Sequence, residues 1–198
     1  MTARVLFLSA ATSRSLRLAR FDDGDPIDAA GAAQARAAAA SLPSAARTAS
    51  SPGRRCRETA AALGLDAAPD PELAGLDAGR WRGRTLDEVG AAEPDALARW
   101  LADPAAAPHG GESVRNLCDR VGRRLQALAR TDGRTLAVVE PEVIRAAAVC
   151  AVGLPEEAFW RLDVPPLTVT EFSGRAGRWN LRLGRPLASS AEDGSGPR

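Results

Sequence analysis

The feature that most constrains the fold is a repeated alternation of a short apolar run, a polar loop and a helical pattern. Residues 5–8 and 135–139 are nearly continuous apolar runs, and each is followed by a loop or a helix start. Such runs are typical of strands that are buried on both faces of a parallel sheet. The sequence therefore predicts an α/β fold: a three-layer sandwich in which helices cover both faces of a mostly parallel central sheet.

Other elements are predicted from periodicity, caps and turn residues. Four helical patterns occupy residues 28–42, 54–63, 112–129 and 141–152. Three further strands are expected, at residues 48–50, 168–172 and 179–183. Residues 66–111 are rich in Pro and Gly and contain two short helical patterns, at 85–89 and 93–101. This composition predicts a small helical insertion.

The length of 198 residues fits a single α/β domain, which we expect over residues 1–188. Residues 189–198 are rich in Ser, Gly and Pro, and we expect a disordered tail there. The net charge of +1 gives no electrostatic footprint for nucleic acid or for an anionic membrane. No apolar stretch is long enough for a signal-peptide core or a membrane span, so we expect a soluble, cytoplasmic protein.

The three cysteines, Cys56, Cys118 and Cys150, are far apart in sequence and form no C-x-x-C pair. Free cysteine commonly packs as a small buried hydrophobe, and we expect this of all three, in a reducing compartment. The sequence predicts no structural metal site and no cofactor.

Six segments occur in order along the chain: VLFLSAATS, DPIDAAGAAQA, SSPGRRCRET, LAGLDAGRWRGRT, PHGGESVRNLCDRV and AVVEPEVIRA. A seventh, AFWRLDVPPLTVTEF, is similar to a closing strand. Together they resemble the histidine phosphatase superfamily, also called the phosphoglycerate-mutase-like family. The resemblance covers nearly the whole chain and implies the same α/β fold.

In that family two histidines face each other across the carboxyl ends of two parallel strands. One histidine attacks phosphorus, and a carboxylic acid protonates the leaving oxygen. The resemblance assigns the first arginine of the family to Ser9, the nucleophilic histidine to Ala10, the acid to Gly75 and the second histidine to Glu140. It keeps one family residue of the site, the arginine of the S-S-P-L-x-R motif, at Arg55.

These replacements imply that the family reaction is absent. A methyl group cannot attack phosphorus, and glycine has no proton to donate. Glu140 adds a negative charge where a phosphate dianion would sit, and a unit charge at about 4 Å is worth about 4 kcal/mol at an effective dielectric of 20. We therefore expect a pseudophosphatase with a binding or regulatory role, whose partner is an anionic small molecule or a protein, including a second copy as a homodimer.

The candidate ligand-binding residues are Arg55, Glu140, Ser9, Thr12 and His109. We expect Arg55 to pair with Glu140, since a buried charge requires a partner. His109 is the only histidine of the chain, and its place in a Pro/Gly loop favours a structural or merely exposed residue over a catalytic base.

Two alternatives stay open at this stage. The first is a repurposed enzyme in which Glu140, or else Glu142 or Asp77, is the general base, and Arg55 or His109 orients an anionic substrate. The second is metal-assisted hydrolysis at clustered carboxylates, which are the ligands that hard divalent cations prefer.

Overall fold

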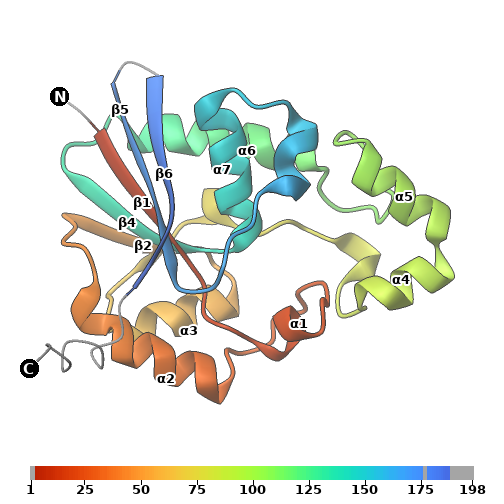
Figure 1. Cartoon of the computed structure of the whole chain (residues 1–198), viewed down its shortest axis with the longest axis horizontal. Coiled ribbons are helices and arrows are strands. Elements are labelled where there is room, and N and C mark those ends of the chain that lie inside the picture. The colour runs from red at the N-terminus through yellow and green to blue at the C-terminus, as the bar shows by residue number, and fades with distance from the viewer. Residues whose placement is uncertain (1–2, 176–177, 188–198) are drawn as a thin grey trace, which may run out of the picture.

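The computed structural model describes residues 3–175 and 178–187, in which a six-stranded sheet lies between two layers of helices (Figure 1). In chain order the strands are β1 (Ala3–Ser9), β2 (Arg47–Ser50), β3 (Ala68–Pro69), β4 (Arg134–Val139), β5 (Thr168–Arg175) and β6 (Arg178–Pro186). Their order in the sheet is β3-β2-β4-β1-β5-β6. The first four strands in that order are parallel, whereas β5 and β6 are antiparallel to their neighbours. The predicted three-layer sandwich with a mostly parallel sheet is confirmed.

The helices in chain order are α1 (Arg14–Arg17), α2 (Ala29–Ala38), α3 (Arg54–Ala62), α4 (Leu86–Ala92), α5 (Pro94–Ala102), α6 (Val114–Leu128) and α7 (Pro141–Val152). Short 3₁₀ segments lie at Ala39–Ser41, Pro71–Leu73, Gly79–Trp81 and Glu156–Arg161. Figure 1 shows α6 and α7 on one face of the sheet and α2 and α3 on the other. Among the described residues, no helix combines the length and the apolar character that crossing a membrane requires.

The central strand β1 is apolar from Val5 to Leu8 because helices cover both of its faces there. Val5 and Phe7 belong to the core formed with α6 and α7, whereas Leu6 and Leu8 belong to the core formed with α2 and α3. Successive side chains of a strand point to opposite faces, so a strand between two helical layers needs apolar residues at every position.

The predicted helical insertion is confirmed as α4 and α5, which project from one end of the sheet (Figure 1). Its core contains Trp81, Val89 and Trp100, with Phe21 packed against them. Trp81 and Trp100 meet edge to face, with ring centroids 5.6 Å apart. This aromatic cluster gives the insertion a rigid surface next to the carboxyl ends of the strands.

The remaining differences from the sequence prediction lie mainly at element ends. The helix expected over 28–42 ends at Ala38 and continues as the 3₁₀ segment, and α6 begins after Ser113, whose Oγ accepts a hydrogen bond from the Asn116 amide (3.1 Å). The four-residue helix α1 has no apolar periodicity, so the sequence did not predict it. The expected tail, residues 189–198, lies outside the described residues.

Candidate functional site

The site is at the carboxyl ends of β1 and β4, where the chain leaves two adjacent parallel strands. Ser9 pairs with Val139 in the sheet, and the Ala10 amide donates a hydrogen bond to the Val139 carbonyl oxygen (3.0 Å). Glu140 is the next residue after β4 and directly precedes α7. Residues 10 and 140, the positions that the resemblance assigns to two histidines, are therefore neighbours in space.

Arg55, in the first turn of α3, and Glu140 form a buried ion pair at this edge. The Arg55 Nε donates to Glu140 Oε2 at 2.9 Å, and Nη2 donates to the same oxygen. The third nitrogen, Nη1, donates to Ser13 Oγ (3.3 Å). Arg55 is 6% exposed and Glu140 is 3% exposed. The predicted pairing is confirmed, and all three guanidinium nitrogens of Arg55 are engaged within the protein.

The two charges are strongly coupled because both are buried. Burial disfavours the charged form of Arg55, but the charge and hydrogen bonds of Glu140 outweigh it, so the pKa of Arg55 is raised. Burial raises the pKa of Glu140; the Arg55 guanidinium opposes this rise, and the nearby Glu142 carboxylate adds to it. Arg55 therefore holds its proton, and Glu140 is the member of the pair that burial pushes towards the neutral form.

A second carboxylate, Glu142, occupies the space next to Gly75. A Cβ atom at Gly75 would lie 2.9 Å from Glu142 Oε1 and 3.1 Å from Glu140 Cγ. The Leu76 amide donates a hydrogen bond to Glu142 Oε1 (3.3 Å). A side chain at position 75 would require Glu142 and Glu140 to shift, so glycine leaves room for both glutamates as they lie. The sequence could indicate Glu142 only as one of several carboxylates.

A cavity of about 490 Å³ opens beside this edge. Its walls combine aromatic and proline side chains with charged ones, among them Phe21, Trp100, Trp160, Pro141, Pro165, Arg20, Asp22, Arg55, Glu142, Arg145 and Asp163. Trp100 and Trp160 are in contact, with ring centroids 4.4 Å apart. Of the two glutamates beside Gly75, Glu142 lines the cavity, whereas Glu140, which is paired with Arg55, is not a lining residue.

Ser9 and Thr12 have structural hydrogen bonds instead of facing the cavity. Ser9 Oγ donates to the Pro165 carbonyl (2.6 Å) and accepts from the Thr168 amide (3.0 Å), which fixes the start of β5. Thr12 Oγ1 donates to Asp28 Oδ1 (3.1 Å), and Asp28 caps α2 as the sequence predicts. Neither residue lines the cavity, and a ligand-binding role for them stays a prediction.

His109 is buried in the helical insertion, with 2% of its surface exposed. Its ring meets Trp81 edge to face at 5.0 Å, and its Nδ1 accepts a hydrogen bond from the Gly111 amide (3.0 Å). This loop packs tightly, since a Cβ at Gly111 would lie 2.1 Å from the Asp77 carbonyl oxygen. The prediction that His109 has a structural role is confirmed. The alternative, that His109 is exposed, is wrong because the aromatic cluster encloses the ring.

The stability of the protein should depend on pH through His109. Burial and the charge of Arg80 lower the pKa of His109, although Asp77 opposes them. Because the folded pKa is below the ordinary value of about 6.5, the stabilisation is present above that value and is lost as the pH falls through the folded pKa. Urea unfolding of the wild type should show this loss between neutral and acidic pH, and His109→Gln should show less of it. Equal pH slopes for both proteins would contradict the assignment.

A cluster of three aspartates is the candidate metal-ligand group among the described residues. Asp22, Asp23 and Asp25 have carboxylate oxygens within 4.8 Å of one another, but Asp25 Oδ2 accepts from the Ser15 amide (2.9 Å) and Asp22 Oδ1 from the Gly24 amide (3.3 Å). The expectation that the chain has no metal site stays a prediction.

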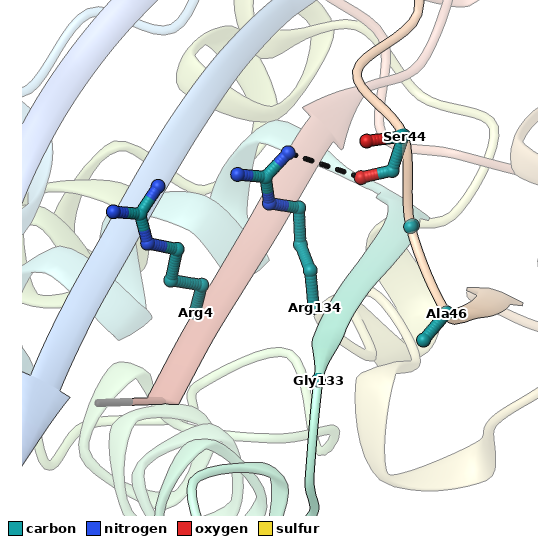
Figure 2. Close-up of a pocket in the computed structure, with 6 residues that line it drawn as sticks. Arg4, Ser44, Ala46, Gly133 and Arg134 are labelled. Atoms are coloured by element: carbon teal, nitrogen blue, oxygen red, sulfur yellow. Dashed lines mark hydrogen bonds between the residues drawn. The ribbon is translucent and has the colours of Figure 1, made fainter. Parts of the chain in front are cut away.

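A second depression lies at the amino-terminal edge of β1 and β4, away from the site. Figure 2 shows the side chains of Arg4 and Arg134 there, with Arg134 donating a hydrogen bond to the Ser44 carbonyl (3.1 Å). No candidate residue from the sequence lines it, so it is separate from the site at the carboxyl edge.

The sheet places β1 and β4 side by side as parallel central strands, and they bring residues 10 and 140 to one edge of an α/β fold. The family model for the histidine phosphatase superfamily (branch 1) matches residues 15–185. The chain belongs to this superfamily.

Individual relatives agree with this assignment. The chain is 34% identical over 131 residues to the bifunctional protein Rv2228c of Mycobacterium tuberculosis, a match that covers 62% of this chain and 36% of the relative. It is 42% identical over 71 residues to a glucosyl-3-phosphoglycerate phosphatase of Mycolicibacterium vanbaalenii, covering 34% of this chain and 32% of that protein. The matches therefore span about a third of the length of these curated relatives.

Solved structures extend the similarity to nearly the whole fold. A mycobacterial glucosyl-3-phosphoglycerate phosphatase, Rv2419c, solved in complex with VO3, superposes with a TM-score of 0.81 at 25% sequence identity. The superposition covers 93% of this chain and 99% of that one.

Proposed function

We propose that this protein is a pseudophosphatase: it keeps the fold of the histidine phosphatases, does not hydrolyse phosphate monoesters through a phosphohistidine, and binds a ligand or partner through the cavity at the carboxyl edge. The observation that carries the proposal is the buried Arg55–Glu140 pair. The arginine that the resemblance keeps for phosphate is neutralised by a carboxylate from the position of the second histidine.

The number of histidines supports the same proposal. A mechanism with two facing histidines cannot be assembled from one, and His109 lies against Trp81 rather than on the cavity wall. Ala10 directly follows the first strand and carries only a methyl group, which has no lone pair to attack phosphorus. The covalent step and its electrostatic support are thus both missing.

The charges on the cavity wall favour a ligand other than a phosphate dianion. Three arginines and three carboxylates line the cavity: Arg20, Arg55, Arg145, Asp22, Glu142 and Asp163. All three arginines are also engaged within the protein, since Arg20 donates to the Gly83 carbonyl, Arg55 binds Glu140 and Arg145 donates to the Leu162 carbonyl (2.8 Å). In place of the anionic small molecule expected from the sequence, the balanced charge and the aromatic walls support an uncharged or zwitterionic one, with a protein partner or a second copy as the other candidate.

A phosphatase assay tests the proposal. The purified chain is expected to hydrolyse a generic aryl phosphate no faster than buffer, because it lacks both the nucleophile and the acid, and the acid alone contributes about 10²–10⁴ in rate. Incubation with phosphate donors is expected to trap no acid-labile phosphoenzyme. Turnover that falls in an Arg55→Lys variant, which keeps the charge but not the paired geometry, would overturn the proposal, as would a trapped phosphoenzyme.

A second function is supported by Glu142. This carboxylate lies within 2.9 Å of the Cβ position of Gly75, where the resemblance places the acid of the family, and it lines the cavity. A repurposed enzyme that uses Glu142 as general acid or base would explain why a carboxylate is kept there while its sequence position has changed. Of the carboxylates that the sequence offers as a base, namely Glu140, Glu142 and Asp77, Glu140 is buried and paired with Arg55, whereas Glu142 lines the cavity. A screen of neutral esters separates the two functions, since only a repurposed enzyme has turnover that Glu142→Gln abolishes.

A further inference from the structure

Two cysteine thiols meet where α6 packs against α7. Cys118 belongs to α6, and Cys150 lies in the last turn of α7. Cys150 Sγ donates a hydrogen bond to the Cys118 carbonyl oxygen (3.2 Å). A pair that is 32 positions apart in sequence is therefore in direct contact in the fold.

Gly122 makes this contact possible. It follows Cys118 by one helical turn, so both residues present the same face of α6 to α7. A Cβ at position 122 would lie 3.1 Å from Cys150 Sγ, which is closer than a side chain normally approaches. The missing side chain forms a notch in α6, and the Cys150 thiol lies in that notch beside Cys118.

The two cysteines differ in accessibility and acidity. Cys150 is exposed, whereas Cys118 is 3% exposed and packs in the core. The expectation that all three cysteines are buried is wrong for Cys150, because it lies at the solvent end of α7. The interaction between the two cysteine side chains lowers the pKa of Cys150 and raises that of Cys118, whose burial raises it further. The accessible thiol is therefore the more nucleophilic of the two.

We propose that Cys118 and Cys150 form a site of reversible oxidation that reacts with small disulfides. The Cys150 thiolate attacks one sulfur of a disulfide RSSR, which forms a mixed disulfide at Cys150 and releases RS⁻. The Cys118 thiol gives its proton to solvent and attacks the Cys150 sulfur, which forms the Cys118–Cys150 disulfide and releases the second RS⁻. In total, two protein thiols are oxidised, and one RSSR is reduced to two RSH.

The oxidised form would join the end of α7 to the middle of α6. This bond closes a loop of about 32 residues that contains all of β4. Cross-linking such a loop restricts the unfolded chain, so the oxidised protein should melt about 5–10 °C above the reduced protein. The inference does not depend on the proposed function, because neither cysteine lines the cavity.

Treatment of the folded chain with glutathione disulfide tests the proposal. The free thiol count, measured after denaturation, should fall from three to one, and peptide mapping should find Cys118 linked to Cys150. Dithiothreitol should restore all three thiols and the lower melting temperature. A wild-type protein that stops at a glutathionyl adduct on Cys150, or that forms no adduct while folded, would overturn the proposal.

Three variants assign the roles. Cys118→Ala should accumulate the mixed disulfide on Cys150, whereas Cys150→Ala should react with glutathione disulfide at least about tenfold more slowly, since it lacks the accessible thiol. Cys56→Ala is the matched control and should behave as the wild type, because Cys56 is fully buried and lies on α3. A disulfide that includes Cys56 in the folded protein would contradict the assignment.

Discussion

Replacement of Arg55 with methionine is expected to lower the free energy of unfolding by about 3–5 kcal/mol. Methionine keeps much of the apolar volume of arginine but leaves the Glu140 carboxylate buried without a cation. An unpaired charge in the interior costs far more than an exposed pair would contribute, because the solvation that it lost on folding is no longer offset. Urea unfolding at neutral pH, followed by far-ultraviolet circular dichroism, measures the change.

The double variant Arg55→Met/Glu140→Leu is the control for this prediction. It removes both charges, so the free energy of unfolding should return to within about 1 kcal/mol of the wild-type value or exceed it. A matched exposed pair on the same helix, Arg54 and Glu58, has more than half of the arginine side chain in solvent. The corresponding Arg54→Met variant should cost less than about 1 kcal/mol. A small effect at both arginines would show that Arg55 is not desolvated as the structure indicates.

Arg55 and Glu140 stabilise the fold only as a pair. Either residue alone would be a liability in this interior, whereas the pair is tolerated because each charge satisfies the other. Position 75 is linked to both glutamates by packing, since a Cβ there would lie 2.9 Å from Glu142 Oε1 and 3.1 Å from Glu140 Cγ. The residues of the site therefore depend on one another, so single substitutions should cost more than paired ones.

Much of the fold could be predicted because local pattern and tertiary environment agree in β1 and β4. Their apolar runs are buried on both faces, and the helices that follow begin with recognisable caps or with proline, as at Pro141. The Arg55–Glu140 pair could also be predicted, because one residue follows a strand end and the other starts a helix at the same edge of the sheet. The family resemblance was needed for this prediction, because the 85 positions between Arg55 and Glu140 do not by themselves indicate a contact.

Other features depend on tertiary contacts that sequence periodicity does not carry. The place of Glu142 beside Gly75 requires that the first turn of α7 meet a loop 66 positions earlier in the chain. His109 is buried because α5 and Trp81 enclose it, although its Pro/Gly loop reads as exposed. Free cysteine is commonly buried, yet Cys150 is exposed because it lies in the last turn of α7, where the core no longer covers the helix. In each case long-range packing decides the environment of a residue whose local sequence is uninformative.

Glu140→Gln is expected to raise the affinity of the protein for inorganic phosphate by about 10²–10³. The substitution removes one negative charge from the position beside Arg55, and at about 4 Å and an effective dielectric of 20 that charge is worth about 4 kcal/mol against an anion. It also weakens the hold on the Arg55 guanidinium, which in the wild type donates two N–H groups to Glu140 Oε2. Titration calorimetry on the folded variant, with circular dichroism as the check on folding, measures the gain.

The cause of this gain can be separated from a general change in charge. Glu142→Gln removes a neighbouring carboxylate while the Arg55–Glu140 pair stays intact, so it should raise phosphate affinity by less than about tenfold. Arg55→Lys/Glu140→Gln keeps the net charge of the single variant but loses the planar fork that binds phosphate oxygens in pairs, and it should lose most of the gain. If folded Glu140→Gln binds phosphate no better than the wild type, then Glu140 does not block the site, and the phosphate-binding geometry was lost elsewhere, at Ser9 or Ala10. A gain that depends on Arg55 would instead show that a single carboxylate separates this site from an anion-binding one.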